Sequence, residues 1–158
     1  MSSKLEAIEA DRKALVEVPL GDVGTYPASV VPTAFAFEHY VHIRCDLFRP
    51  HGPLRAEPPA SDELRLAPTL DWIQAALPQQ NADLLEGLEG MDKAVEIRLT
   101  GVSARTLRVG GADVAAHITS DSDAFVRWVT QRGTWEGLGV HGEGDRAALE
   151  IIRHLRVF

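Results

Sequence analysis

Hydrophobic residues in the first half of the chain recur every three or four positions, which is the spacing of an amphipathic helix. This spacing predicts helices over residues 3–17, 28–48 and about 68–77. A weaker pattern, ADLLEGLEG, predicts a further helix that ends in glycine. Pro32 fits the second helix only within its first turn. After this helix, RPHGPLRAEPPAS contains four of the nine prolines of the chain and predicts a loop.

After Gly90 the spacing of hydrophobic residues changes to two. In AVEIRLTG, Val95, Ile97 and Leu99 alternate with polar residues, which is typical of a half-buried strand. RTLRVGG and ADVAAHITS predict two more strands, and the Gly-Gly pair between them predicts a tight hairpin turn. Residues 121–131 predict a helix with an acidic first turn, and GLGVHG and DRAALEIIRHL predict a last short strand and a last helix.

The order of these elements predicts the α+β class, with helices first and a small sheet afterwards. We expect a helical segment over residues 1–88 and a small α/β domain with an antiparallel sheet over residues 89–158. A chain of 158 residues that is 45% hydrophobic can bury a core of its own, as one domain or as two small ones that share an interface.

Composition and charge narrow the kind of function. The formal net charge is −7, so the chain lacks the excess of basic residues that nucleic-acid binding needs, and we expect no nucleic-acid partner. A single cysteine cannot form an internal disulfide, and the N-terminal sequence lacks the basic start and apolar run of a secretory signal. No run of about 18 apolar residues predicts a membrane span. These features favour a cytoplasmic protein without a membrane partner.

The stretch FEHYVHIRCDLF contains the candidate chemistry. On a helix, Glu38, His42 and Cys45 share one face, and His39, His42 and Asp46 form an overlapping set. Carboxylate, imidazole and thiolate are all zinc ligands. One helix usually supplies two ligands, so Glu38 and His42 are the preferred pair, with Cys45 as a buried small residue or a support for a ligand. The alternative interpretation is an ordinary solvent-exposed pair on a helix.

Two longer stretches resemble a known family. AFEHYVHIRCDLFRPHGPL, followed by LAPTLDWIQAALPQQN, resembles the second half of the DinB-like helical domain of the mycothiol-dependent maleylpyruvate isomerase family. VEIRLTGVSARTLRVG and DAFVRWVTQRGTWEGLGVHGEGDRAALEIIRHLRVF are similar to the small sterol-carrier-protein-like domain of that family. The resemblance covers roughly residues 27–158. In the family, a Glu and a His four residues later bind a divalent metal, and the resemblance assigns these roles to Glu38 and His42.

The resemblance implies an activity and a cosubstrate. It implies a metal-dependent isomerase or transferase, with zinc as the expected metal, which uses mycothiol on a small unsaturated acid. Arg132, at the end of a predicted helix, is then the candidate for binding the substrate carboxylate. In its plainer interpretation, Arg132 complements the dipole of that helix.

Three departures from the family favour an alternative function. The first helices of the family supply another histidine ligand, for which little sequence precedes Glu38. Ile43 and Cys45 replace a Gly and an Asp that usually follow the metal-binding His, and residues 1–26 match poorly, as in a shortened member. The alternative is a non-catalytic module with a degenerate metal site that binds a small apolar ligand or a partner protein.

The helical segment also predicts a partner for its own hydrophobic face. Two or three helices cannot close a four-helix bundle around Phe35, Phe37, Tyr40 and Val41. We therefore expect this face either to dock on the α/β domain or to pair with a second copy in a homodimer. A two-fold bundle would bring two Glu38/His42 pairs together.

Overall fold

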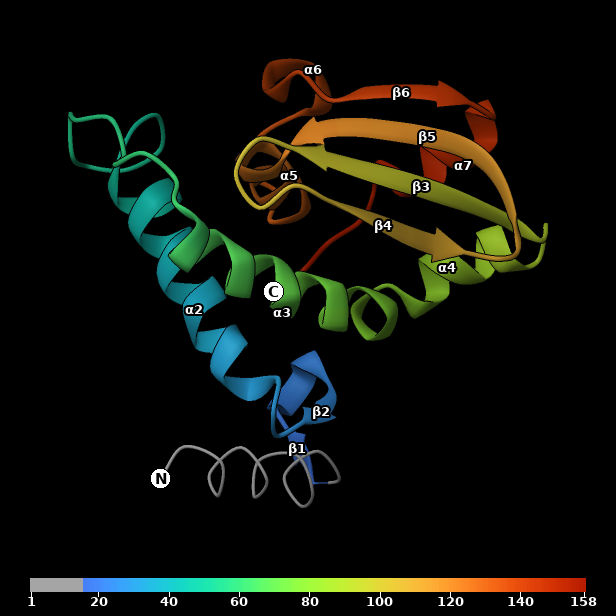
Figure 1. The fold of residues 1–158 in the computed structure, drawn as a ribbon, viewed down its shortest axis with the longest axis horizontal. Helices are drawn as coiled ribbons and strands as arrows, with labels where there is room; N and C mark the ends of the chain where they lie inside the picture. The colour runs from blue at the N-terminus through green and yellow to red at the C-terminus, as the bar shows by residue number, and fades with distance from the viewer. Residues whose placement is uncertain (1–15) are drawn as a thin grey trace.

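A computed structural model describes residues 16–158 and shows an α+β fold (Figure 1). The helix predicted over residues 3–17 lies outside this range except at its end, where a strand begins. The strands β1 (Glu17–Pro19) and β2 (Thr25–Pro27) form a small antiparallel hairpin, joined by the short 3₁₀ turn η2 (Gly21–Val23). The segment between the first two predicted helices therefore contains a sheet of its own.

The predicted long helix is present but changes its winding. It begins as the regular helix α2 (Val31–Val41), with Pro32 in the first turn as predicted, and continues as the wider π-helix η3 (His42–Leu47). The proline-rich loop follows, and the chain then returns as α3 (Glu63–Gln80) and α4 (Ala82–Glu89). Figure 1 shows α2 leaning away from the sheet and α3 passing beneath it.

Helix α3 begins earlier than the sequence pattern predicted. The Asp62 side chain accepts a hydrogen bond from the backbone N–H of Arg65 at 3.0 Å and so caps the new helix. This cap allows a turn of helix before Pro68, which the prediction had taken as the beginning. Leu70, Ile73 and Leu77, which are spaced as on one side of a helix, are buried.

A four-stranded mixed sheet forms the second half of the fold. Its strand order is β4-β3-β5-β6. The strands are β3 (Lys93–Thr100), β4 (Arg105–Gly110), β5 (Asp113–Asp121) and β6 (His141–Gly144). Two of the strand pairs are antiparallel, but β3 and β5 run parallel, so the expectation of a wholly antiparallel sheet is wrong.

The predicted Gly-Gly hairpin is also wrong, although both of its strands exist. Strands β4 and β5 lie on opposite sides of β3, and the chain between them crosses the end of β3. There the N–H of Gly111 donates to the carbonyl of Lys93 at 2.7 Å. Gly110 has φ +92°, and a Cβ on it would lie 2.5 Å from the same carbonyl. The glycines therefore permit a close crossing rather than a two-residue turn.

Helices cover one face of this sheet. Val95, Ile97 and Leu99 are buried on that face, whereas Arg98 and His117 are exposed on the other. Three helices follow β5 in the sequence: α5 (Ser122–Val129), α6 (Trp135–Leu138) and α7 (Arg146–Ile152). The stretch GLGVHG, predicted as a strand, is divided between the end of α6, a turn and the beginning of β6.

The hydrophobic core continues from the helical segment into the sheet. One cluster of buried side chains includes Leu70 and Trp72 of α3 together with Ile97 of β3 and Phe125 of α5. The division at residue 88 stays a prediction. Every helix within residues 16–158 is too short or too polar to cross a lipid bilayer.

The predicted cover of the α2 face comes largely from within the chain. Phe37, Tyr40 and Val41 are each 3% exposed, because α3 packs along α2 and Tyr40 reaches the beginning of α5. Phe35 differs, since it is 64% exposed. Three of the four predicted residues are therefore covered within the chain, mainly by α3 of the helical segment rather than by the α/β domain, which was the expectation.

Candidate functional site

Three polar side chains spaced by four residues form a connected row on α2 and η3. The Nε2 atom of His42 lies 2.9 Å from a carboxylate oxygen of Glu38. The Nδ1 atom of His42 lies 2.7 Å from a carboxylate oxygen of Asp46. Glu38 and His42 are more than half exposed, so the row faces solvent along most of its length.

Arg132 joins this row from a distant part of the sequence. It follows α5, and its Nε and Nη2 atoms each donate to a different oxygen of Asp46 at 2.7 Å. The structure therefore brings together all three predicted site residues, Glu38, His42 and Arg132. Asp46, which the sequence placed only in an overlapping set, is the residue that connects them.

Hydrogen bonds fix the charge of this connection. The hydrogen bonds from Arg132 are the largest cause of the lowered pKa of Asp46, which is about 2, and the hydrogen bond with His42 lowers it further. The same hydrogen bonds raise the pKa of Arg132. Asp46 is thus a carboxylate and Arg132 a guanidinium over the whole ordinary pH range.

The guanidinium of Arg132 is already engaged. Besides its two bonds to Asp46, Nη1 donates to the carbonyl of Thr130 at 2.9 Å. Three of its five N–H donors are therefore in use, and a substrate carboxylate would compete with Asp46 for the two-bond face of the guanidinium. The predicted role of Arg132 in binding a substrate stays a prediction, and its contacts in the structure are those of a positioning residue.

The donor atoms of Glu38 and His42 fit a divalent metal. In a tetrahedral zinc site, two ligand atoms that each lie about 2.1 Å from the ion are about 3.4 Å apart, so the 2.9 Å between these side chains would widen by about half an ångström when an ion enters. Metal-binding histidines commonly donate their other N–H to a carboxylate, which is the place of Asp46 here.

The ligand set from this chain is small. Within residues 16–158, no group of three or more His, Cys, Asp or Glu side chains is placed to hold a metal ion. Catalytic zinc sites usually have three protein ligands. A metal at Glu38 and His42 would therefore have coordination positions left for water, for a thiol or for side chains of a second copy.

Cys45 and His39 lie apart from the pair. Cys45 is 4% exposed, and burial, followed by the nearby charge of Asp123, raises the pKa of its thiol. It is thus a neutral buried group, in keeping with the predicted buried small residue. His39 is exposed, and its Nδ1 lies 2.7 Å from the carbonyl of Phe35.

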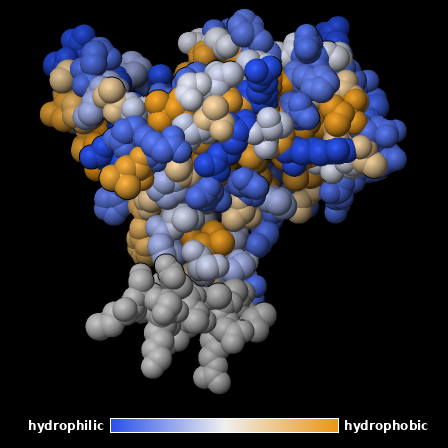
Figure 2. All heavy atoms as spheres, in the orientation of Figure 1, coloured by the Kyte–Doolittle hydropathy of each residue, from blue (hydrophilic) through white to orange (hydrophobic). Residues whose placement is uncertain are grey.

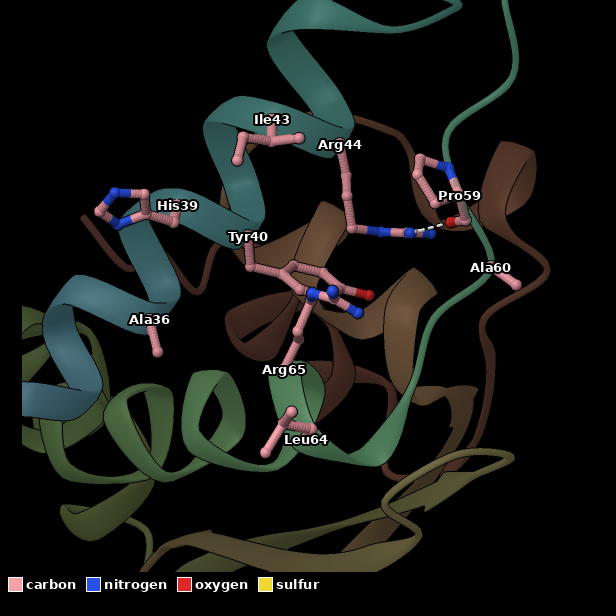
Figure 3. A pocket seen from close by; sticks show the side chains of 9 residues that line it. All are labelled: Ala36, His39, Tyr40, Ile43, Arg44, Pro59, Ala60, Leu64 and Arg65. Carbon is pink, nitrogen blue, oxygen red and sulfur yellow. Dashed lines mark hydrogen bonds between the residues drawn. The ribbon is translucent and has the colours of Figure 1, made fainter.

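A groove between α2 and the beginning of α3 was missed by the sequence reasoning (Figure 3). Its volume is about 420 Å³, and its apolar lining includes Ala36, Ile43 and Leu64. The Tyr40 ring also lines it, with the guanidinium carbon of Arg44 5.0 Å from the ring centre. The groove is assembled from two helices and the proline loop, so no single stretch of sequence predicts it.

Comparison of the chain with known protein families found no matching family model, and comparison with curated proteins found no matching relative. The resemblance to the mycothiol-dependent maleylpyruvate isomerase family therefore rests on the quoted motifs alone.

Proposed function

We propose that the protein binds a divalent metal, with zinc expected, through Glu38 and His42, and that it is an isomerase or transferase that uses a thiol on a small unsaturated acid. One observation supports the metal most strongly. Asp46 holds the Nδ1 side of His42, and Arg132 holds Asp46 with two hydrogen bonds, so the Nε2 side is directed at Glu38. Metal-binding histidines are oriented in this way.

The proposed roles of the residues follow from their contacts. Glu38 and His42 would hold the ion. Asp46 and Arg132 would position the imidazole of His42 and would not bind the ion themselves. A metal in this position would lower the pKa of a bound thiol or water. The exposed position of the pair leaves room for a thiol as large as mycothiol, the cosubstrate that the family resemblance implies.

Zinc binding by the purified protein tests this proposal. Elemental analysis and calorimetric titration with zinc should show about one ion per chain in the native protein, and near-complete loss in Glu38→Gln and His42→Gln. Asp46→Asn should weaken binding by about 10- to 100-fold, because the imidazole loses its fixed orientation. His39→Gln is the matched control, since His39 is exposed on the same helix but bonded to a backbone carbonyl.

Two results would contradict the metal site. One is the absence of zinc binding by the native protein, and the other is an equal loss of binding in His39→Gln. If zinc binds as expected, mixing the zinc-loaded protein with mycothiol and maleylpyruvate tests the enzymatic part separately. Product formed by native protein but not by His42→Gln would support it.

The groove of Figure 3 favours a second candidate function, a module that binds a small apolar ligand. Its volume of about 420 Å³ lies within the range of small-molecule sites. An apolar fluorescent dye such as anilinonaphthalene sulfonate should bind to metal-free protein, and Leu64→Asp should abolish its fluorescence. Val114→Asp, at an exposed valine on the sheet, should not. Equal fluorescence in both variants would contradict a ligand site in the groove.

A further inference from the structure

A second and smaller cavity lies on the other side of Arg44. Its volume is about 220 Å³, and it is enclosed by η3, the proline loop and α5. Three arginines line it, and each comes from a different one of these segments: Arg44, Arg49 and Arg127.

The three arginines differ in how they are paired. Arg44 already has partners within the chain, because its Nε lies 3.3 Å from Asp123 and its Nη1 donates to the carbonyl of Pro59. Within residues 16–158, the side chains of Arg49 and Arg127 form no ion pair and no hydrogen bond. Guanidinium groups carry five donors in a planar fork that matches carboxylate and phosphate oxygens. Two such forks at one cavity are therefore ready to accept an anion.

The other groups that line the cavity leave it positive. Asp123 is already bound by Tyr40 at 2.5 Å and by Arg44. Glu57 is the other carboxylate, and it forms no ion pair with any described residue. Cys45 also lines the cavity, and its buried thiol is neutral because burial raises its pKa. Three arginines thus face two carboxylates, one of which is engaged.

We propose that this cavity binds the oxyanion group of a small ligand, a carboxylate or a phosphate, with Arg49 and Arg127 as its binding residues and Arg44 as a fixed positive charge. A volume of about 220 Å³ is below that of most drug-sized ligand sites, so the ligand is small or places only its acidic group here. The proposal is independent of the metal pair, because neither Glu38 nor His42 lines the cavity.

Calorimetric titration of the full, metal-free chain at low ionic strength tests the site with two probes, inorganic phosphate and succinate. Arg49→Gln and Arg127→Gln should each weaken binding about tenfold or more, since each removes a charged hydrogen-bond donor. Arg98→Gln is the matched control, because Arg98 is exposed on the sheet and forms no ion pair with any described residue. Its affinity should change less than twofold.

A variant with the opposite expected effect completes the test. Glu57→Gln should tighten binding, because it removes a negative charge from the cavity lining. Since Arg49 is exposed, Arg49→Gln and Glu57→Gln keep the test decisive even if Arg127→Gln does not fold. Glu38→Gln should bind both probes as the native protein does, which separates this site from the metal site.

Each outcome of the titration has a meaning. Binding of phosphate alone or of succinate alone supports the site and identifies the acidic group of its ligand. The proposal is overturned if neither probe binds to the native protein. It is equally overturned if Arg98→Gln weakens binding as much as Arg49→Gln, because the effect would then be one of overall charge.

Discussion

At the scale of single residues, Asp46 carries the most consequence, because it connects His42 to Arg132. The pKa of its carboxyl is about 2 in the folded chain and close to 3.9 in an unfolded one. A lowered folded pKa stabilises the fold fully above the unfolded value, and the effect is lost as the pH falls through the folded value. The pair is partly exposed, so we expect about 1 kcal/mol after solvent screening.

Urea denaturation of the metal-free protein at pH 7 and at pH 2 measures this contribution. Asp46→Asn should lower the free energy of unfolding at pH 7 by about 1 kcal/mol, and the difference from native protein should shrink toward pH 2. Asp113→Asn serves as control, since Asp113 is exposed and forms no ion pair with any described residue. An Asp46→Asn deficit that is the same at both pH values would contradict the explanation.

At the scale of elements, the contact between α2 and α5 brings Arg132, which follows α5, next to the row of Glu38, His42 and Asp46. The buried hydroxyl of Tyr40 on α2 lies 2.5 Å from Asp123 on α5 and 2.8 Å from Ser61 in the loop. Burial, with the hydrogen bond to Asp123, raises the pKa of Tyr40, so the phenol remains a donor. This one side chain therefore ties three segments together.

Replacing Tyr40 tests the contribution of its hydrogen bond to Asp123. Tyr40→Phe should lower the free energy of unfolding by about 1–2 kcal/mol, because Asp123 loses a hydrogen bond. Combining it with Asp123→Asn should cost clearly less than the sum of the two single changes, since the residues are in contact. Urea denaturation of the four proteins in this cycle provides the values. Simple additivity would show that the contact contributes nothing of its own.

Elements were easier to predict from the sequence than their partners. Hydrophobic spacing located α2, α4, β3 and α5 closely, because that spacing reports the local backbone period. It could not show that β3 separates β4 from β5, since alternation is the same whichever strand is adjacent. The Glu38/His42 pair was visible because its spacing is local. The bond from Asp46 to Arg132 spans 86 residues, and no local pattern carries that information.

At the scale of the whole molecule, the outer side of α2 and η3 is open. Phe35, Ile43 and Leu47 are 64%, 43% and 45% exposed. Figure 2 shows hydrophobic residues on the left of the molecule, where Figure 1 shows α2 and the loop after it. Phe35 is the part of the predicted helical face that the described residues leave uncovered, and Ile43 and Leu47 extend this exposed hydrophobic surface. Such a surface favours the homodimer, which stays a prediction.

Light scattering after size exclusion measures the predicted homodimer. The native protein should elute with twice the mass of one chain, and Phe35→Asp should shift it toward the monomer, because a charge on the shared face opposes burial. Val114→Asp places the same charge on the sheet and should leave the mass unchanged. A native protein that is monomeric at about 100 µM, well above a micromolar dissociation constant, would refute the homodimer.

The strand order also decides where the molecule does not associate. The crossing at Gly110 makes β4, rather than β3, one edge of the sheet, and β6 is the other edge. Edge strands with free backbone groups can recruit strands of other chains into aggregates, and short length and charged side chains discourage it. Strand β6 has four residues, and β4 carries Arg105 and Arg108. Both edge strands of the sheet therefore carry features that discourage pairing with strands of other chains. The exposed hydrophobic surface of α2 and η3 is then the better candidate for specific association.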